Sequence, residues 1–356
     1  MTKILKLTKK LGEKFIEGNL NLLKIKRGQH LKPKRIWIEL TDKCNSHCQH
    51  CHIWQKKSTT EQLTIEELRK IFSDPLMSDI EAIINSGGEM FLRNDILEIM
   101  KLEHEFFPKA ILNISTNGIL ADKALAVIEE LLKEGIKINP CVSIDGIGEA
   151  HDRVRGTSGN FEKADYLLHR LVELRKKYPD KMLIAVGFTL SDLTINDWDL
   201  VKNYAAKLDV EFITQWYNQS SFYENDQKAS LSNRMVEIVK QQPNTIIREK
   251  WLKLLKGQPI KFRCFAAETF FALRCDGGVV PCLSLWGDTL GNIRNDDLSK
   301  IWYSVQADKV RKKIASCPGC LNTWGVEWSI SATFYPRLMF YLRNLSAILE
   351  RLKRRD

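Results

Sequence analysis

The sequence predicts an α/β protein that contains a partial (β/α)6 barrel followed by a small C-terminal domain. Six short apolar segments typical of strands alternate with segments of helical periodicity, and this alternation predicts parallel strands joined by helices. Short polar signatures follow several of the strands, and two tight groups of cysteines occur, one in each part of the chain. Because the carboxyl ends of parallel strands meet at one edge of a barrel, these signatures are expected to form one site.

Each strand and helix of the barrel is expected from its own pattern. Helical patterns cover Thr64–Phe72 and Lys123–Glu134, and Gly135 ends the second because glycine readily takes the left-handed conformation at a helix end. The strands are short apolar runs that lie between such patterns. We expect strands at Arg35–Leu40, Ile80–Ile84, Ala110–Ser115, Lys137–Ile144, Met182–Leu190 and Val210–Trp216.

The segments outside the barrel differ from it in composition. Residues 1–34 form a basic amphipathic segment in which apolar residues recur at helical spacing, and residues 35–216 form the barrel. A helical connection at 217–260 leads to a small metal-stapled domain at 261–330, which has five cysteines and no long periodic helix. Residues 331–356 form a second basic amphipathic helix. The apolar residues of the first segment are Ile4, Leu7, Leu11 and Phe15.

Composition and charge exclude several classes of protein. The 356 residues are 44% hydrophobic and 28% charged, which is typical of a globular protein and not of a disordered one. Neither a transmembrane run nor a signal peptide is found, so we expect a cytoplasmic protein. The net charge of +10 resides in the ends, with +9 in residues 1–35 and +4 in residues 333–356, which leaves −3 between them. This distribution argues against a nucleic-acid groove through the core.

The first cysteine group follows directly on the first expected strand. Cys44, Cys48 and Cys51 are spaced by four and three residues, and three thiolates at this spacing can hold one four-iron cube and leave one iron open. An open iron can bind a substrate or a cofactor. The alternative is a zinc site made of these three cysteines and one histidine, either His47, His50 or His52.

This loop resembles that of the radical S-adenosylmethionine (radical SAM) enzymes, whose Cys-x3-Cys-x2-Cys motif follows the first barrel strand. Further motifs of the family match at the ends of the next three strands. The resemblance implies that Cys44, Cys48 and Cys51 hold a [4Fe–4S] cluster and that SAM binds at its open iron. It implies SAM contacts by His50, Gly87, Gly88, Glu89, Ser115, Asn117, Ser143, Asp145 and Arg155.

The second cysteine group resembles the auxiliary-cluster domains appended to many radical SAM enzymes. The chain has no cysteine after Cys320, so it matches the short form, called twitch, rather than the seven-cysteine form, called SPASM. The resemblance implies a second [4Fe–4S] cluster with no open iron, held by Cys264, Cys282, Cys317 and Cys320. A structural zinc site with the same four ligands is the alternative.

The two remaining cysteines and the substrate are less constrained by the sequence. Cys141 and Cys275 belong to neither group, and each is a candidate for donating a hydrogen atom to a substrate radical, although a buried free cysteine often serves as a small apolar core residue. The family implies that SAM is cleaved to a 5′-deoxyadenosyl radical that abstracts hydrogen from an unactivated carbon. The cysteine pattern is similar to that of twitch-containing aminocyclitol dehydrogenases. This similarity favours an enzyme that oxidises or rearranges a substrate of the carbohydrate type or a lipid-linked substrate.

Two other functions stay open at this point, a peptide or protein maturase and a non-catalytic iron–sulfur electron carrier. Only 34 residues precede the first expected strand, so we expect no built-in domain for a peptide leader. The expected partners are an electron donor of the flavodoxin or ferredoxin type and a small-molecule or lipid-linked substrate. The two basic ends further suggest docking on an anionic membrane surface.

Overall fold

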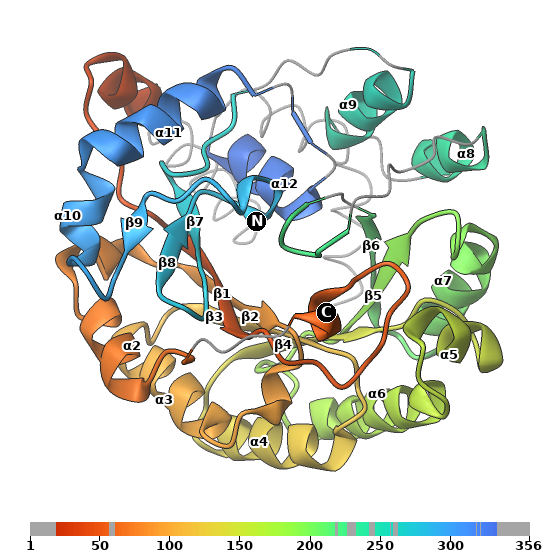
Figure 1. Ribbon diagram of the computed structural model, residues 1–356. Coiled ribbons are helices and arrows are strands. Elements are labelled where there is room, and N and C mark those ends of the chain that lie inside the picture. The colour runs from red at the N-terminus through yellow and green to blue at the C-terminus, as the bar shows by residue number, and fades with distance from the viewer. Residues whose placement is uncertain are drawn as a thin grey trace, which may run out of the picture.

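The computed structural model describes residues 19–56, 61–217, 220–225, 233–241, 246–256, 258, 263–317, 319–320 and 322–332. A curved sheet lies inside a layer of helices that wraps around its outer face (Figure 1). Most of the first expected amphipathic segment and nearly all of the last one lie outside the described residues. Among the described helices, none is both long and apolar enough to cross a membrane.

Six parallel strands form the barrel part of the sheet in chain order, as the sequence predicts. A further strand, β7 (Phe270–Leu273), pairs in parallel with β1, and two antiparallel strands follow, β8 (Gly278–Val280) and β9 (Gly291–Asn292). The sheet has two ends, β6 and β9, so the barrel is open. The six barrel strands are β1 (Arg35–Thr41), β2 (Ala82–Gly87), β3 (Ile111–Thr116), β4 (Ile138–Ser143), β5 (Ala185–Leu190) and β6 (Glu211–Trp216).

Amphipathic helices cover the outer face of these strands. The first, α2 (Ile65–Phe72), begins at a capping box in which Thr64 and Glu67 bind each other's backbone amides. The helices that follow are α3 (Ile96–Phe106), α4 (Ala121–Lys133), α5 (Glu149–Arg155), α6 (Asn160–Lys177) and α7 (Trp198–Lys207). Short 3-10 turns lie at η1 (Ile53–Gln55), η2 (Pro75–Asp79), η3 (Met90–Leu92), η4 (Ile195–Asp197) and η5 (Leu283–Leu285).

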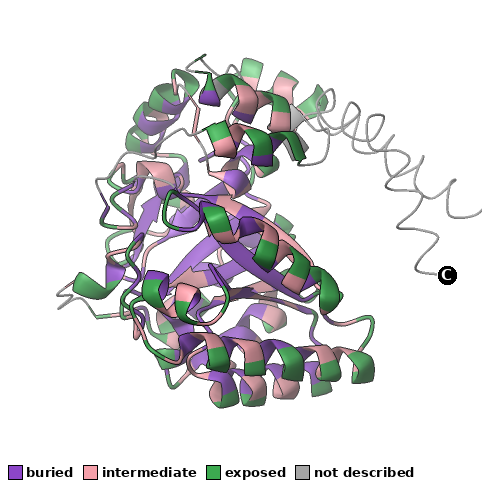
Figure 2. Cartoon of the chain, turned by 90° about the vertical axis from the view of Figure 1, so that its right-hand side faces the viewer, coloured by how far each residue is buried: buried purple, intermediate pink, exposed green. Residues whose placement is uncertain are grey.

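The strands separate an apolar core from a polar interior. On β4, Ile138, Pro140 and Val142 are buried, whereas the alternate residues are only half-buried, because successive side chains of a strand point to opposite faces. The apolar set packs beneath the helices, where the strands and the inner faces of the helices are buried (Figure 2). The alternate set is therefore left to face the inside of the barrel.

In the C-terminal part, helices occur where the sequence predicts them and also within residues 261–330, where no long helix is expected. Two helices, α8 (Asn233–Gln241) and α9 (Ile246–Leu255), lie in the expected helical connection. The expectation of no long periodic helix in 261–330 is wrong, because α11 (Val305–Ala315) has 11 residues. Its buried residues recur at spacings of three and four, and Ser304 caps its first turn. The shorter helices on either side are α10 (Leu298–Trp302) and α12 (Thr323–Ser331).

Candidate active site

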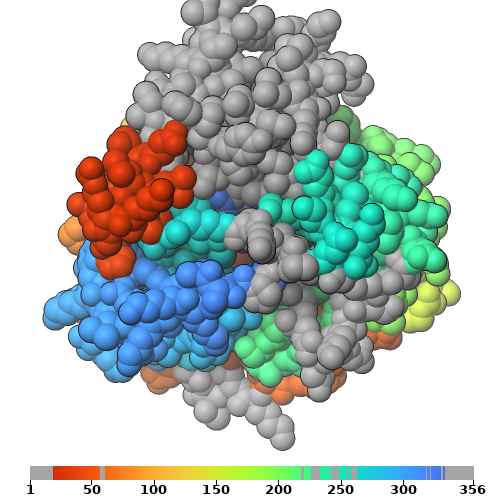
Figure 3. All heavy atoms as spheres, turned by 90° about the horizontal axis from the view of Figure 1, so that it is seen from above, coloured from red at the N-terminus to blue at the C-terminus, as the bar shows by residue number. Residues whose placement is uncertain are grey.

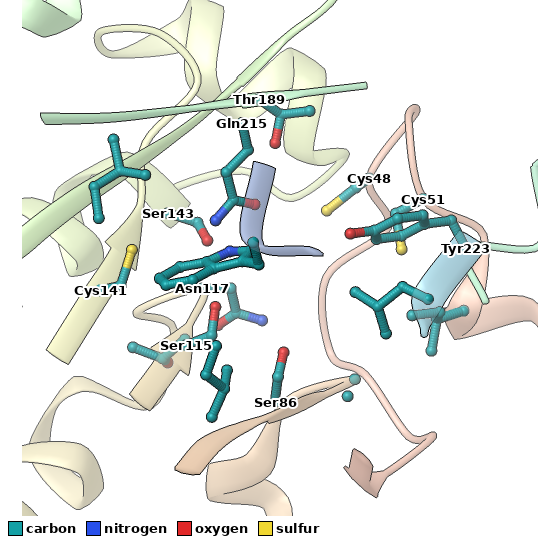
Figure 4. A pocket seen from close by; sticks show the side chains of 18 of the residues that line it. Cys48, Cys51, Ser86, Ser115, Asn117, Cys141, Ser143, Thr189, Gln215 and Tyr223 are labelled. Carbon is teal, nitrogen blue, oxygen red and sulfur yellow. The ribbon is translucent and has the colours of Figure 1, made fainter. Parts of the chain in front are cut away.

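A cavity of about 510 Å³ occupies the inside of the barrel and is lined by alternate residues of neighbouring strands (Figure 4). The residues of β5 at the cavity are small: Ala185 and Thr189 line it, and Gly187 lies between them in the strand. A Cβ atom on Gly187 would lie 2.8 Å from the Sγ atom of Cys141, so the glycine leaves room for that thiol. The other lining residues of the strands include Ile84 and Ser86 on β2, Asn113 and Ser115 on β3, Asn139, Cys141 and Ser143 on β4, and Glu211, Ile213 and Gln215 on β6.

The loop after β1 carries the first three cysteines to the rim of this cavity, and all three line it. Two glycines at the end of β2 let the loop approach closely: a Cβ atom on Gly87 would lie 2.3 Å from the carbonyl oxygen of Thr41, and one on Gly88 only 2.1 Å from that of Lys43. Any larger residue at either position would push the loop away from the strand. Backbone contact therefore fixes the position of the cysteine loop.

The three thiols form an electrostatically unfavourable group when no cation lies between them. Burial raises the pKa of Cys44 to about 11 and that of Cys51 to about 12, and the neighbouring thiol of Cys48 adds to both shifts. Thiolates are the form that binds iron, and bound metal stabilises them. The donor set and its burial thus fit a bound iron–sulfur cluster.

Three polar side chains reach the sulfur atoms of this loop. Arg155 Nη1 donates to Cys48 Sγ at 3.7 Å, and Asn117 Nδ2 donates to Cys44 Sγ at 3.9 Å. The hydroxyl of Ser46 lies 3.2 Å from Cys48 Sγ. Hydrogen bonds to cluster sulfurs tune the reduction potential of iron–sulfur sites.

Arg155 is held in place by a buried carboxylate. Its Nη2 atom lies 2.7 Å from Asp145 Oδ2, and the other oxygen of Asp145 accepts the amide of Thr189 at 2.7 Å. Burial alone would raise the pKa of Asp145, but Arg155 and His50 outweigh burial and hold that pKa below its usual value. His50 lies 3.7 Å from the same carboxylate, and burial lowers its pKa to about 4, so its ring is neutral near pH 7.

Glu89 is fully buried and bonded to the next strand. Its carboxylate accepts hydrogen bonds from the Thr116 hydroxyl at 2.9 Å, from the Asn117 amide at 2.8 Å and from the Phe91 amide at 3.3 Å. Burial raises its pKa to about 6 despite these donors. The carboxylate thereby ties the end of β2 to the end of β3, beside the cavity rim.

The structure brings most of the expected SAM contacts into one cavity. Glu89 and Asp145 are exceptions, since both are completely buried and neither lines the cavity. Of the two spare cysteines, Cys141 lines the cavity, whereas Cys275 does not and is buried, its amide bonded to Glu39. The SAM contacts themselves stay a prediction. The expected contacts that line the cavity are His50, Gly87, Gly88, Ser115, Asn117, Ser143 and Arg155.

Six polar strand residues that line the cavity were not expected from the sequence: Ser86, Asn113, Asn139, Thr189, Glu211 and Gln215. The signal that could have found them is the alternation within the strands, because polar residues at every second position of an otherwise apolar strand mark a polar inner face. Glu211 pairs in register with Ala185, which pairs with Cys141 and then Ser115. Glu211 is therefore in register with Ser115, three strands away.

The second group of cysteines gathers beside β7 and β8. Burial raises the pKa of Cys282, and the thiols of Cys320 and Cys264 add to that shift. Burial also raises the pKa of Cys320 to about 11, and Cys264 and Cys317 add to that shift. The four thiols therefore lie close enough to act on one another. In the described part of the chain, no three His, Cys, Asp or Glu side chains are arranged to hold a single metal ion.

An aromatic wall separates the two groups of cysteines. Trp37, Leu283 and Trp324 line the 510 Å³ cavity on one side and a cavity of about 20 Å³ on the other, which Cys282 also lines. Trp37 packs edge-on against Phe222, with ring centroids 4.8 Å apart. One layer of side chains therefore lies between the barrel cavity and the second cysteine group.

Comparison with known families decides what this arrangement is. The sequence model of the radical SAM superfamily matches residues 38–200, and that of the SPASM iron–sulfur cluster-binding domain matches residues 264–321. The chain belongs to the radical SAM superfamily. It is therefore an enzyme of the radical SAM type, with SAM and [4Fe–4S] clusters as its cofactors.

Two curated relatives are both from Methanosarcina barkeri. This chain is 26% identical to Fe-coproporphyrin III synthase, and the match covers 77% of this chain and 74% of that protein. It is 27% identical to AdoMet-dependent heme synthase, over 77% of this chain and 83% of that protein. Both identities are low, so the names give the type of enzyme and leave the substrate to be argued from the site.

Solved structures share the fold. Streptococcus suis SuiB bound to the precursor peptide SuiA superposes with a TM-score of 0.63 and 16% identity, over 82% of this chain and 70% of SuiB. The enzyme anSMEcpe with bound AdoMet and a peptide gives a TM-score of 0.56 and 17% identity, over 91% of this chain and 100% of the other. At these identities the likeness shows the fold alone, a radical SAM barrel with a C-terminal cluster domain.

Proposed function

We propose that this radical SAM enzyme abstracts a hydrogen atom from a hydroxylated small molecule of the carbohydrate type, free or linked to a lipid, and oxidises it. The observation that carries the proposal is the lining of the barrel cavity. Hydroxyl and amide groups face it from five strands, and aromatic side chains close its sides. The hydroxyls and amides are Ser86, Asn113, Ser115, Asn139, Ser143, Thr189 and Gln215.

Such a lining suits a neutral polyol better than a polyanion. Hydroxyl and amide groups both donate and accept hydrogen bonds, as do the hydroxyls of a sugar. Among the described residues, the one lysine or arginine that lines the cavity is Arg155, which is already paired with Asp145. A substrate with several carboxylates or phosphates would need further cations there, because a buried charge is costly unless it is paired.

The residues can be assigned roles in such an oxidation. When bound, SAM and the first cluster supply a 5′-deoxyadenosyl radical as the hydrogen acceptor. Cys44, Cys48 and Cys51 hold that cluster, and Arg155 donates a hydrogen bond to the sulfur of Cys48. Oxidation of an alcohol to a ketone then releases one proton and one electron from the carbon radical. Glu211 accepts the proton, because among the described residues it is the carboxylate that lines the cavity.

The electron leaves through the aromatic wall. Cys264, Cys282, Cys317 and Cys320 hold the auxiliary cluster on its far side, where four ligands leave no iron open. Since Trp37 and Trp324 line both cavities, the electron crosses a single layer of side chains. The wall also keeps the substrate away from the second group of thiols.

A second candidate is an enzyme that acts on a tetrapyrrole, which the two relatives from Methanosarcina barkeri favour. The names of both enzymes specify a porphyrin product, and each match covers most of both chains. The shortage of cations in the cavity argues against it. A peptide substrate, the third possibility, has support only from structures that share the fold.

Deuterium transfer separates these candidates. The reduced enzyme is incubated with SAM and, in separate reactions, with carbon-deuterated sugars and aminocyclitols, with deuterated Fe-coproporphyrin III and with a deuterated peptide. The proposal predicts deuterium in 5′-deoxyadenosine with a carbohydrate-type substrate alone. Transfer from the porphyrin or from the peptide, with none from any sugar, would overturn it. Glu211→Gln should then lose the ketone product while it still transfers deuterium.

A further inference from the structure

A second hollow, of about 670 Å³, lies at the opposite end of the barrel strands from the first cysteine group. It is formed by the segment that precedes β1, by the loop before β2 and by the start of β7. We call it the lysine groove, after Lys24, Lys32 and Lys34, which line it. The N-terminal residues that form it lie beside the C-terminal part of the chain (Figure 3).

The lysine groove is strongly basic. Residues 19–34 contain four lysines and one arginine but no acidic residue. Its lining has three lysines against one carboxylate, that of Asp79. Lys34 is 3.1 Å from Glu81 and Lys32 donates to the hydroxyl of Ser78 at 3.0 Å, whereas Lys24 is exposed on the surface. A surface of this charge attracts acidic partners over a distance of about one Debye length.

Exposed apolar side chains lie next to these charges. Leu20 is 49% exposed and Leu23 is 43% exposed, both on the helical residues 19–26. Tyr303, 52% exposed, lines the same groove from the other side. A basic rim around a few exposed apolar groups is the composition of a transient protein interface rather than of a small-molecule site.

The groove lies within one turn of chain of Cys264, one of the four expected ligands of the auxiliary cluster. Thr269, which lines the groove, donates its amide to the carbonyl of Phe265 at 2.9 Å, and Phe265 directly follows Cys264. The first cysteine group is far from it, since β1 has seven residues and spans about 23 Å between the two ends. A redox partner docked at the groove would therefore exchange electrons with the auxiliary cluster and not with the SAM cluster.

We propose that the lysine groove is the docking site of an acidic one-electron carrier protein of the flavodoxin or ferredoxin type. One electron passes from the reduced auxiliary cluster to the docked carrier, which is reduced as the cluster returns to its oxidised state. The proposal rests on the auxiliary cluster of the proposed function, because that function leaves this cluster reduced after every turnover. Docking at this end leaves the mouth of the substrate cavity clear.

Charge reversal tests the proposal. Flavodoxin binding to the holoenzyme is measured by calorimetry at low and high salt for the parent and for Lys24→Glu/Lys26→Glu. Lys24 lines the groove and Lys26 lies two residues further along the same helical segment; both are exposed, so the variant should fold. We expect the Kd to rise at least tenfold in the variant, and the affinity of the parent to fall as salt screens the charges. The matched control, Lys163→Glu/Lys176→Glu on α6, has the same change in net charge at exposed positions elsewhere and should bind as the parent does.

A kinetic measurement tests whether the docked flavodoxin exchanges electrons with the auxiliary cluster. Flavodoxin should re-oxidise the pre-reduced auxiliary cluster at least tenfold more slowly in Lys24→Glu/Lys26→Glu than in the control, whereas dithionite should reduce both equally. Equal flavodoxin affinity and rate in the two variants would overturn the proposal. So would retained flavodoxin binding combined with loss of binding to phosphatidylserine vesicles, which would make the groove a membrane surface. Failure of the carbohydrate assay would leave the calorimetry unchanged, so the two proposals fail separately.

Discussion

The two groups of cysteines differ in what surrounds them. The loop of Cys44, Cys48 and Cys51 faces a large cavity, and a buried arginine and an amide reach its sulfurs. The second group meets a cavity of about 20 Å³ and receives a hydroxyl, with Ser329 donating to Cys264 Sγ at 3.7 Å. The first group of cysteines therefore has room for a ligand beside it and has a charged side chain near its sulfurs. The second group lies behind aromatic rings and has little space beside it.

In the proposed function, the two sites divide radical chemistry from electron transfer. Three cysteine ligands would leave an iron for SAM, and the adjoining cavity would have to exclude water while it admits the substrate. Four cysteine ligands would leave no open iron, so the second site would need only close packing and a path for the electron.

The largest effect is expected from removing the three ligands of the open site. Replacing Cys44, Cys48 and Cys51 together by Ala should reduce the iron content from about eight to about four per chain, because a four-iron cluster is lost. SAM cleavage should cease. Iron analysis and assay of 5′-deoxyadenosine check this, and iron that stays near eight would show that the ligands are wrongly assigned.

Removing one ligand of the closed site should separate cleavage from oxidation. Cys317→Ala should also reduce iron to about four, yet slow SAM cleavage without substrate should persist. Oxidised product should not form, since its electron has no acceptor. Chromatography of both products checks this. Normal product formation would make the auxiliary site structural and refute the oxidation.

A smaller effect is expected from the buried pair beside the open site. Arg155→Ala should weaken SAM binding by about tenfold to a hundredfold, as expected for loss of a charge-assisted contact. It should also destabilise the protein by about 3–5 kcal/mol, because Asp145 stays buried without its partner.

A double variant distinguishes these two roles. Arg155→Ala/Asp145→Asn removes the unpaired charge and should recover much of the stability, as measured by thermal unfolding, without recovering SAM affinity. If the double variant binds SAM as the parent does, Arg155 acts only through packing.

The smallest effect is expected from the hydroxyl at the closed site. Ser329→Ala removes a hydrogen bond to Cys264 Sγ and should lower the reduction potential of the auxiliary cluster, since such bonds favour the reduced state. The SAM cluster should be unaffected. Redox titration followed by electron paramagnetic resonance measures both, with Ser329→Thr as the control that keeps the hydroxyl. An unchanged auxiliary potential would contradict this role.

Much of the barrel could be predicted because its signals are local. The six strands are short apolar runs, and the motifs at their ends lie where parallel strands place them. The ends of the strands shifted by up to three residues, as for Met182, because pairing with neighbours decides where a strand begins. β7 could not be predicted as a barrel strand, since its four residues gain their place only by pairing with β1.

The site was harder to predict in detail because its contacts join distant segments. The sequence places Arg155 and Asp145 near the cavity, but their pairing arises from the turn of α5 back toward the end of β4. Glu89 satisfies donors on β3, which no local pattern indicates. Glu211 could be placed in the cavity only once the strand pairing had set the position of β6 in the sheet.

The division between an open and a closed cluster is tested most directly by adding SAM to each single-cluster variant. The Cys317→Ala variant retains the first cluster, and the Cys44→Ala/Cys48→Ala/Cys51→Ala variant retains the second. Electron paramagnetic resonance of the reduced proteins should show that SAM changes the spectrum of the first variant and leaves that of the second unchanged. A spectrum that SAM changes in the triple variant, or leaves unchanged in Cys317→Ala, would contradict the assignment.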